Sequence, residues 1–251
     1  MSNRWVPRQY GVWAMLLTPV IVGSVISDID WGHALLTVSW VTAYLGFMAV
    51  KGCSRQRGGR RYRVPAAIYC GVGIISVALL LVWRPGLAWW AVPLGVLGAS
   101  SLLLIKTRRE RSVVNDAVMI GASCLMAVVA TSAPKLTTVE WSLFLSVVTT
   151  PRPWLVFSVL AAYFWGTILY VKTMIRERGK RGWYVASVAY HLVTFAAAML
   201  INPWVAAVGA IASARAIVIP LAWPRAKPKV IGMIEMLITV TLAIVVCLTM
   251  R

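Results

Sequence analysis

Four ionisable side chains lie inside long apolar stretches of this 251-residue sequence: Asp116, His191, Arg215 and Glu235. An ionisable group within a membrane span costs at least about 2.5 to 3.5 kcal/mol, so such residues usually face the protein interior or a water-filled cavity. Carboxyl and imidazole groups can exchange protons with a substrate, and a guanidinium group can bind an anion. We therefore consider Asp116, His191 and Glu235 candidates for acid/base catalysis and Arg215 a candidate for anion binding.

Each of these four residues could instead have a purely structural role. Arg215 and Glu235 fall at nearly the same level of two consecutive antiparallel stretches, so an ion pair would offset part of the cost of burying both. His191 has Ser187 one turn away on its own helical face, and a lone helical histidine is commonly a hydrogen-bonded interior residue. Asp116 could cap a helix, since a negative charge is favoured at a helix start.

The stretches that hold these residues are long enough to cross a bilayer, which takes about 20 apolar residues with roughly 17 to 25 allowed. We predict nine membrane-spanning runs: 11–26, 34–50, 64–83, 89–105, 114–133, 153–173, 183–201, 203–223 and 230–250. The apolar segment 140–148 is too short to span and is predicted to lie at the membrane surface.

The composition excludes a soluble fold. Only 13% of the residues are charged and 60% are hydrophobic, whereas soluble domains carry about 25% charged residues. No long polar linker divides the chain. We therefore predict a single all-α domain, residues 1–251, built as a polytopic transmembrane bundle of about nine helices.

The basic residues predict the orientation of this bundle. Of the 25 Lys and Arg residues, 20 lie in the N-terminal leader and in alternate loops, and four lie on the other side. The positive-inside rule then places the N-terminus and the basic loops in the cytoplasm. The net charge of +18 does not indicate nucleic-acid binding, because the cations sit in short loops between apolar runs.

The four ionisable residues share the cytoplasmic half of the bundle, about 3 to 12 Å deep at 1.5 Å per residue. If they converge, they form a polar pocket that opens to the cytoplasm. Arg8, Lys172 and Arg176 would lie at its rim and act with Arg215 as anion-binding residues. Such a rim favours a phosphate or a lipid head group.

Three segments of the sequence resemble the YwiC-like family of bacterial membrane proteins. The opening segment, PRQYGVWAMLLTP at residues 7–19, is similar to the start of its members, with a basic residue, a Gly, a Trp-Ala-Met triplet and a Pro. Residues 111–122, around Asn115 and Asp116, and residues 170–179 fit the same family. The resemblance implies a bacterial plasma membrane protein, and it implies no established activity.

A more distant resemblance is to the UbiA-type intramembrane prenyltransferases, which also have nine helices and a cytoplasmic N-terminus. Members of that family hold Mg²⁺ and diphosphate with aspartate-rich motifs after their second and sixth helices. Here the loop at residues 51–63 has no acidic residue, and the loop after the sixth run offers only Glu177. The oxygen ligands that Mg²⁺ requires are missing, so we predict no metal site and no cofactor.

The best-supported prediction is a UbiA-like membrane-embedded protein that binds or processes an isoprenoid or a lipid with an anionic head group at the cytoplasmic face. A small-molecule or proton-coupled transporter is an alternative, with Arg215, Glu235 and His191 along its path. A non-catalytic assembly or interaction protein would fit the structural roles of the same residues. The expected partners are the lipid bilayer and an anionic lipid or isoprenoid.

Overall fold

The computed structural model describes residues 5, 10–53, 59–110 and 112–251. These residues form ten α-helices and three short 3₁₀-helices, with no strand among them. The α-helices are α1 (Tyr10–Ile26), α2 (Trp31–Cys53), α3 (Arg63–Trp83), α4 (Ala91–Lys106), α5 (Val113–Ser132), α6 (Trp141–Val148), α7 (Pro151–Ile175), α8 (Arg181–Ile201), α9 (Pro203–Ala222) and α10 (Pro228–Thr249). The 3₁₀-helices are η1 (Gly59–Tyr62), η2 (Pro85–Trp90) and η3 (Ala133–Lys135).

The helices confirm the predicted multi-pass membrane protein. Eight helical stretches are long and apolar enough to cross a membrane. Helix α1 has 17 residues, which is the lower limit for a span, and α6 is too short to cross. Large apolar side chains cover the outer surface, for example Val82 and Leu200 with 85% and 90% of their surface exposed. Hydrocarbon is the solvent that suits such a surface.

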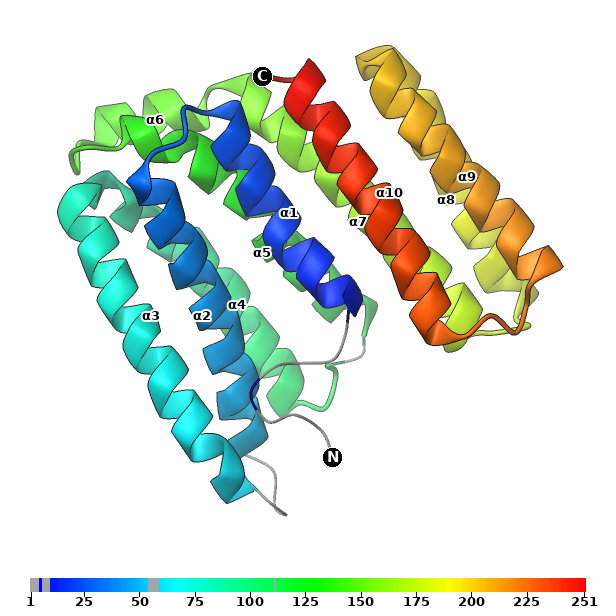
Figure 1. Ribbon diagram of the computed structural model, residues 1–251, viewed down its shortest axis with the longest axis horizontal. Coiled ribbons are helices and arrows are strands. Elements are labelled where there is room, and N and C mark those ends of the chain that lie inside the picture. Colours follow the sequence, from blue (N-terminus) through cyan, green and yellow to red (C-terminus); the bar gives the residue numbers. More distant parts are fainter. Residues whose placement is uncertain (1–4, 6–9, 54–58, 111) are drawn as a thin grey trace.

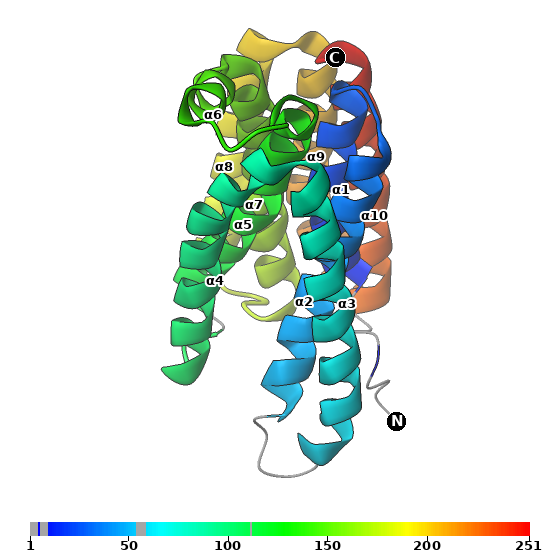
Figure 2. The same cartoon turned by 90° about the vertical axis from the view of Figure 1, so that its left-hand side faces the viewer.

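Four helices form the middle of the bundle. Helix α1 packs against α5 and α10, and α5 packs against α7. The α2–α3 hairpin lies on one side of this group and the α8–α9 hairpin lies on the other (Figure 1). Helix α4 packs on α5 and stands apart from the α2–α3 hairpin in the turned view (Figure 2).

Helix α5 is at the centre of the packing. Cys124, Ala127, Val128 and Ala130 on this helix are fully buried. Small residues dominate this set, and small side chains let neighbouring helix backbones approach closely, which is a main source of helix association in lipid. Of the candidate residues, Asp116 lies on α5 itself and Lys172 on α7, which packs against it, whereas His191, Arg215 and Glu235 lie on α8, α9 and α10, which pack on α7.

The two ends of the bundle differ in charge. Helices α2, α4, α7 and α9 finish at the same end (Figure 1), which we call the basic end. Its exposed cations include Arg60, Arg61, Lys106, Arg108, Arg109, Arg176, Arg178, Lys180, Arg181 and Arg225. The short helix α6 lies at the opposite end (Figure 1). A cytoplasmic basic end remains the prediction of the positive-inside rule.

Candidate functional site

Three of the predicted site residues meet between α8, α9 and α10. Arg215 forms an ion pair with Glu235 through Nη1 and Oε1, and its Nη2 lies 3.0 Å from Nε2 of His191. Arg215, Glu235 and His191 are 5%, 3% and 4% exposed. The predicted Arg215–Glu235 pair is confirmed, and His191 extends it to a third helix.

Two residues of α7 complete this group, which we call the arginine cluster: Arg215, Glu235, His191, Tyr170 and Thr167. The Tyr170 ring lies under the guanidinium group, 4.2 Å from its central carbon. Thr167 donates a hydrogen bond of 2.9 Å to Oε2 of Glu235. Both oxygens of the Glu235 carboxylate therefore have partners, as a buried ion pair requires.

The hydrogen bonds of His191 determine its protonation. Nδ1 lies 2.7 Å from the carbonyl oxygen of Ser187, and a carbonyl can only accept, so Nδ1 carries the proton. Arg215 can only donate, so Nε2 must accept from its Nη2. His191 is therefore a neutral imidazole that supports the guanidinium group and does not compete with it for Glu235.

Gly166 on α7 leaves room for the His191 ring. A Cβ atom at this position would lie 3.0 Å from Nε2 of His191 and 3.3 Å from Cε1. Nε2 is the atom that accepts from Arg215. The glycine thus lets α7 approach the ring that orients the arginine.

Substitution Gly166→Ala is expected to push the His191 ring off Arg215 and to lower the free energy of unfolding by about 1 to 3 kcal/mol, a typical cost of overpacking. The chain has two histidines, so ¹⁵N-labelled imidazole gives two sets of NMR signals. The His191 signals should shift, and those of His33, at the opposite end, should stay. An unmoved His191 signal would contradict the contact.

Asp116 does not join the arginine cluster. Its carboxylate forms an ion pair with Lys172 of α7, whose Nζ also lies 5.7 Å from the centre of the Trp183 ring. Asp116 does lie in the first turn of α5, where a negative charge is favoured, but the cap is Ser112, whose hydroxyl accepts from the N–H of Asn115. The expected convergence of four ionisable groups is therefore wrong for Asp116.

The predicted rim residues differ in their burial and in their partners. Lys172 is mostly buried and paired with Asp116. Arg176 follows α7 and is exposed at the basic end. Arg8 lies outside the described residues. The anion-binding role of these residues and of Arg215 remains a prediction.

A second polar network at the opposite end was missed from the sequence. Arg84 donates to Asp30 at 2.5 Å and to the carbonyl of Pro134 at 2.9 Å. Asp30 also pairs with the His33 ring, whose Nε2 lies 3.0 Å from the Ala130 carbonyl oxygen. The sequence feature that could have indicated this network is the spacing of three residues between Asp30 and His33 at a helix start. This network ties the α1–α2 turn and the start of η2 to the end of α5.

The charge of Asp30 fits that structural role. Burial of the carboxyl group alone would raise its pKa, but the hydrogen bond from Arg84 and the neighbouring His33 outweigh this effect. The pKa of Asp30 is therefore lower than its ordinary value of 3.8, and the group is ionised at neutral pH.

An apolar groove of about 410 Å³ lies between α4 and the α2–α3 hairpin, and residues of α1, α5 and η2 complete its walls. It runs from Leu36 and Leu87, near the opposite end, to Phe47 and Ser101, toward the basic end. Its walls are apolar apart from a few hydroxyl groups such as that of Ser101. We call this space the apolar groove.

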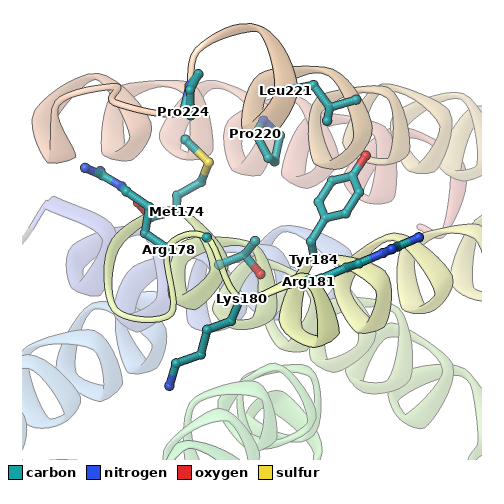
Figure 3. Close-up of a pocket in the computed structure, with 10 residues that line it drawn as sticks. Met174, Arg178, Lys180, Arg181, Tyr184, Pro220, Leu221 and Pro224 are labelled. Carbon is teal, nitrogen blue, oxygen red and sulfur yellow. The ribbon is translucent and has the colours of Figure 1, made fainter.

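A smaller pocket of about 200 Å³ lies at the basic end, between the ends of α7 and α9 and the start of α8. Met174, Tyr184 and Pro220 lie around its middle, and the head groups of Arg178, Lys180 and Arg181 point outward from it (Figure 3). We call it the basic pocket. Among the described residues, no group of three or more His, Cys, Asp and Glu side chains could hold a metal ion.

Comparisons with known proteins agree with the resemblance seen in the sequence. The family model described as YwiC-like protein matches residues 6–131, about half of the chain. Protein YwiC of Bacillus subtilis (strain 168) is 26% identical over 188 residues, which cover 75% of this chain and 74% of that protein. An uncharacterized protein of Haemophilus influenzae is 25% identical with the same coverage. No solved structure matches, so the UbiA-like fold stays a prediction. The chain belongs to the YwiC-like family.

Proposed function

We propose that this protein binds a lipid or isoprenoid with an anionic head group. The hydrocarbon chain would lie in the apolar groove, and the head group would lie at the basic end, on the cytoplasmic side of a bacterial plasma membrane. The asymmetry of the basic residues supports this orientation. The proposal needs no metal and no cofactor.

The apolar groove is the observation that carries the proposal. Its volume of about 410 Å³ falls within the roughly 300 to 1,000 Å³ of pockets that hold small molecules. Helices that pack only for stability tend to exclude such a space, because close packing supplies much of their association in lipid. The lining residues on α2 extend from Leu36 to Phe47, eleven residues later, which is roughly 16 Å at 1.5 Å per residue, so the space would hold part of a hydrocarbon chain.

Charges lie where a head group would be. Lys51, one turn beyond Phe47 of the groove wall, pairs with Glu110 at 2.5 Å, so this ion pair joins the end of α2 to the segment after α4. Lys106, Arg108 and Arg109 beside it are exposed. Each cation near an anionic lipid contributes about 1 kcal/mol of attraction, so several together favour an anionic head group.

Processing of the bound lipid, as distinct from binding, would use an acid close to the same end of the groove. Ser101 of the groove wall donates to the side-chain oxygen of Asn115 at 3.0 Å, and Asp116 is the next residue. Of the three candidate acids and bases, Asp116 is the one carried by a helix that lines the groove, and its carboxylate is paired with Lys172 of α7. His191 and Glu235 lie in the arginine cluster, on helices that do not line the groove.

Two glycines of α4 provide a matched test. Gly98 lines the groove, and Gly95, one turn away, lies on the exposed surface outside it. Neither has an atom within 4 Å of a Cβ position. Substitution Gly98→Phe is expected to fill the groove and Gly95→Phe is expected to leave it open, with similar effects on folding.

Native mass spectrometry of the purified proteins measures lipid retention. The wild type and Gly95→Phe should carry a lipid with an anionic head group, and Gly98→Phe should lose most of it. The mass of the retained lipid identifies an acyl or an isoprenoid chain. Equal retention by all three proteins, or none by the wild type, would refute the proposal and leave a transporter or an assembly protein as the alternatives.

A further inference from the structure

We infer that the basic pocket leads to a second binding site, for a small oxyanion such as a phosphate group, at the arginine cluster. This site is separate from the apolar groove and lies in the other half of the bundle, between α7, α8 and α9. Its ligand would accept hydrogen bonds from Tyr170, Ser187 and Arg215.

These three side chains have donors without partners. Tyr170 Oη, Ser187 Oγ and Arg215 Nε are buried and have no hydrogen-bonding partner among the described residues. The three residues are 0%, 1% and 5% exposed. A buried polar group without a partner is costly and uncommon in native structures. All three groups can donate, so one species rich in acceptors would satisfy them together.

Two of the donors, on Tyr170 and Arg215, belong to the arginine cluster, and Ser187 adjoins it through His191. The Tyr170 ring lies against the guanidinium group of Arg215, and the Ser187 carbonyl holds the His191 ring that contacts the same guanidinium group. Arg215 uses Nη1 for Glu235 and Nη2 for His191. Its Nε edge is left for a further acceptor.

The basic pocket leads toward this cluster along three helices. Tyr184 of its wall is one turn from Ser187 on α8, and Thr173 is one turn from Tyr170 on α7. Pro220 of its wall lies five residues from Arg215 on α9, which is about 7.5 Å at 1.5 Å per residue. The pocket and the three donors are thus separated by about one helical turn.

The rim of the basic pocket would attract an anion. Arg178 is fixed there, because its Nε donates to the Met174 carbonyl at 2.9 Å. The charged heads of Arg178, Lys180 and Arg181 surround the opening and point away from its middle (Figure 3). Cations in this arrangement raise the local concentration of anions. The buried donors would then bind the anion directly.

Inorganic phosphate is the first probe, and the test variant is the double substitution Tyr170→Phe/Ser187→Ala. It removes two hydroxyl groups and keeps the ring under Arg215. Because neither hydroxyl has a partner within the described protein, the fold should tolerate their loss. Tyr190→Phe is the control, since the Tyr190 hydroxyl donates to the Ala162 carbonyl at 3.0 Å.

Isothermal titration in nanodiscs of neutral lipid should show phosphate binding by the wild type. The double variant should bind at least about a hundredfold more weakly, because it removes two hydrogen bonds and each one to a charged ligand contributes about tenfold or more. Tyr190→Phe and the groove variant Gly98→Phe should bind as the wild type does, which separates this site from the proposed lipid groove.

Nanodiscs that contain phosphatidic acid distinguish the source of the phosphate group. Binding of free phosphate in neutral nanodiscs indicates a soluble ligand, and retention of phosphatidic acid alone, lost in the double variant, indicates a lipid head group. Both results support an oxyanion site. The inference is overturned if neither probe binds to the wild type. It is also overturned if the double variant binds both probes as the wild type does. Either result is expected if water alone satisfies the three donors.

Discussion

Substitution Arg215→Met is expected to lower the free energy of unfolding by about 3 to 5 kcal/mol, because it leaves the Glu235 carboxylate buried in a membrane span without its cation. The two side chains are 3% and 4% exposed, so an unpaired Glu235 carboxylate would keep most of its desolvation cost. Thermal unfolding in detergent measures the effect, and roughly 2 to 4 °C of the midpoint corresponds to each kcal/mol.

Two further proteins test the physical reason. The double substitution Arg215→Met/Glu235→Leu removes both charges and should recover most of the lost stability, since apolar residues of similar volume often replace a buried pair without cost. Lys180→Ala breaks an exposed pair, in which Lys180 is 68% exposed and contacts Glu177 at 2.7 Å, and should change stability by less than about 1 kcal/mol. A double variant as unstable as Arg215→Met would contradict the explanation.

The helices were predictable because one physical constraint dominates them. A span must be apolar over the thickness of the hydrocarbon, and all nine predicted runs coincide with helices whose ends differ by at most three residues. The short α6 was also expected, because eight residues cannot cross. The start of α4 was placed two residues early, since the Pro85-Gly86 turn continues as the 3₁₀-helix η2 to Trp90.

Depth along the membrane normal was predictable, and rotation about each helix axis was not. Arg215 and Glu235 share a level on consecutive helices, and they meet. Asp116 lies toward the same end of the bundle, but its face of α5 meets Lys172 on α7. The sequence offered no means to determine which face of α5 turns toward which neighbour.

The apolar groove and the unpartnered donors were also beyond the sequence. The groove arises because α4 packs on α5 and stands apart from the α2–α3 hairpin (Figure 2). Its walls consist mainly of apolar residues, which the sequence alone does not distinguish from other residues of the membrane spans. Ser187 and Tyr170 look like ordinary span residues, and only the geometry of three helices leaves their hydroxyl groups without a partner among the described residues.

The two proposed sites occupy different halves of the chain. Every residue that lines the apolar groove falls within residues 12–129, inside the segment that matches the YwiC-like family model. The arginine cluster belongs to α7, α8, α9 and α10, outside that match. Helices α1 and α5 join the halves, because α1 packs on α10 and α5 packs on α7. The contact between α1 and α5 therefore holds together the two helices through which the halves are joined.

That contact depends on Gly23 of α1. A Cβ atom at Gly23 would overlap the carbonyl oxygen of Ala127 on α5 and lie 2.9 Å from the Cβ of Ala130. Neither a helix backbone nor a fully buried Ala130 can move aside as the end of a long side chain could. Gly23→Ala must therefore separate α1 from α5 along the middle of the bundle.

We expect Gly23→Ala to lower the free energy of unfolding by about 1 to 3 kcal/mol or more, although alanine by itself favours a helix over glycine by about 1 kcal/mol. Gly121→Ala on α5 is the matched control, because its Cβ meets no atom within 4 Å, and it should be neutral or stabilising. The thiol of Cys124 is fully buried, so its reaction with a thiol-specific dye on heating reports the separation of the two helices. Equal midpoints for the two alanine variants would show that α1 and α5 tolerate a wider spacing.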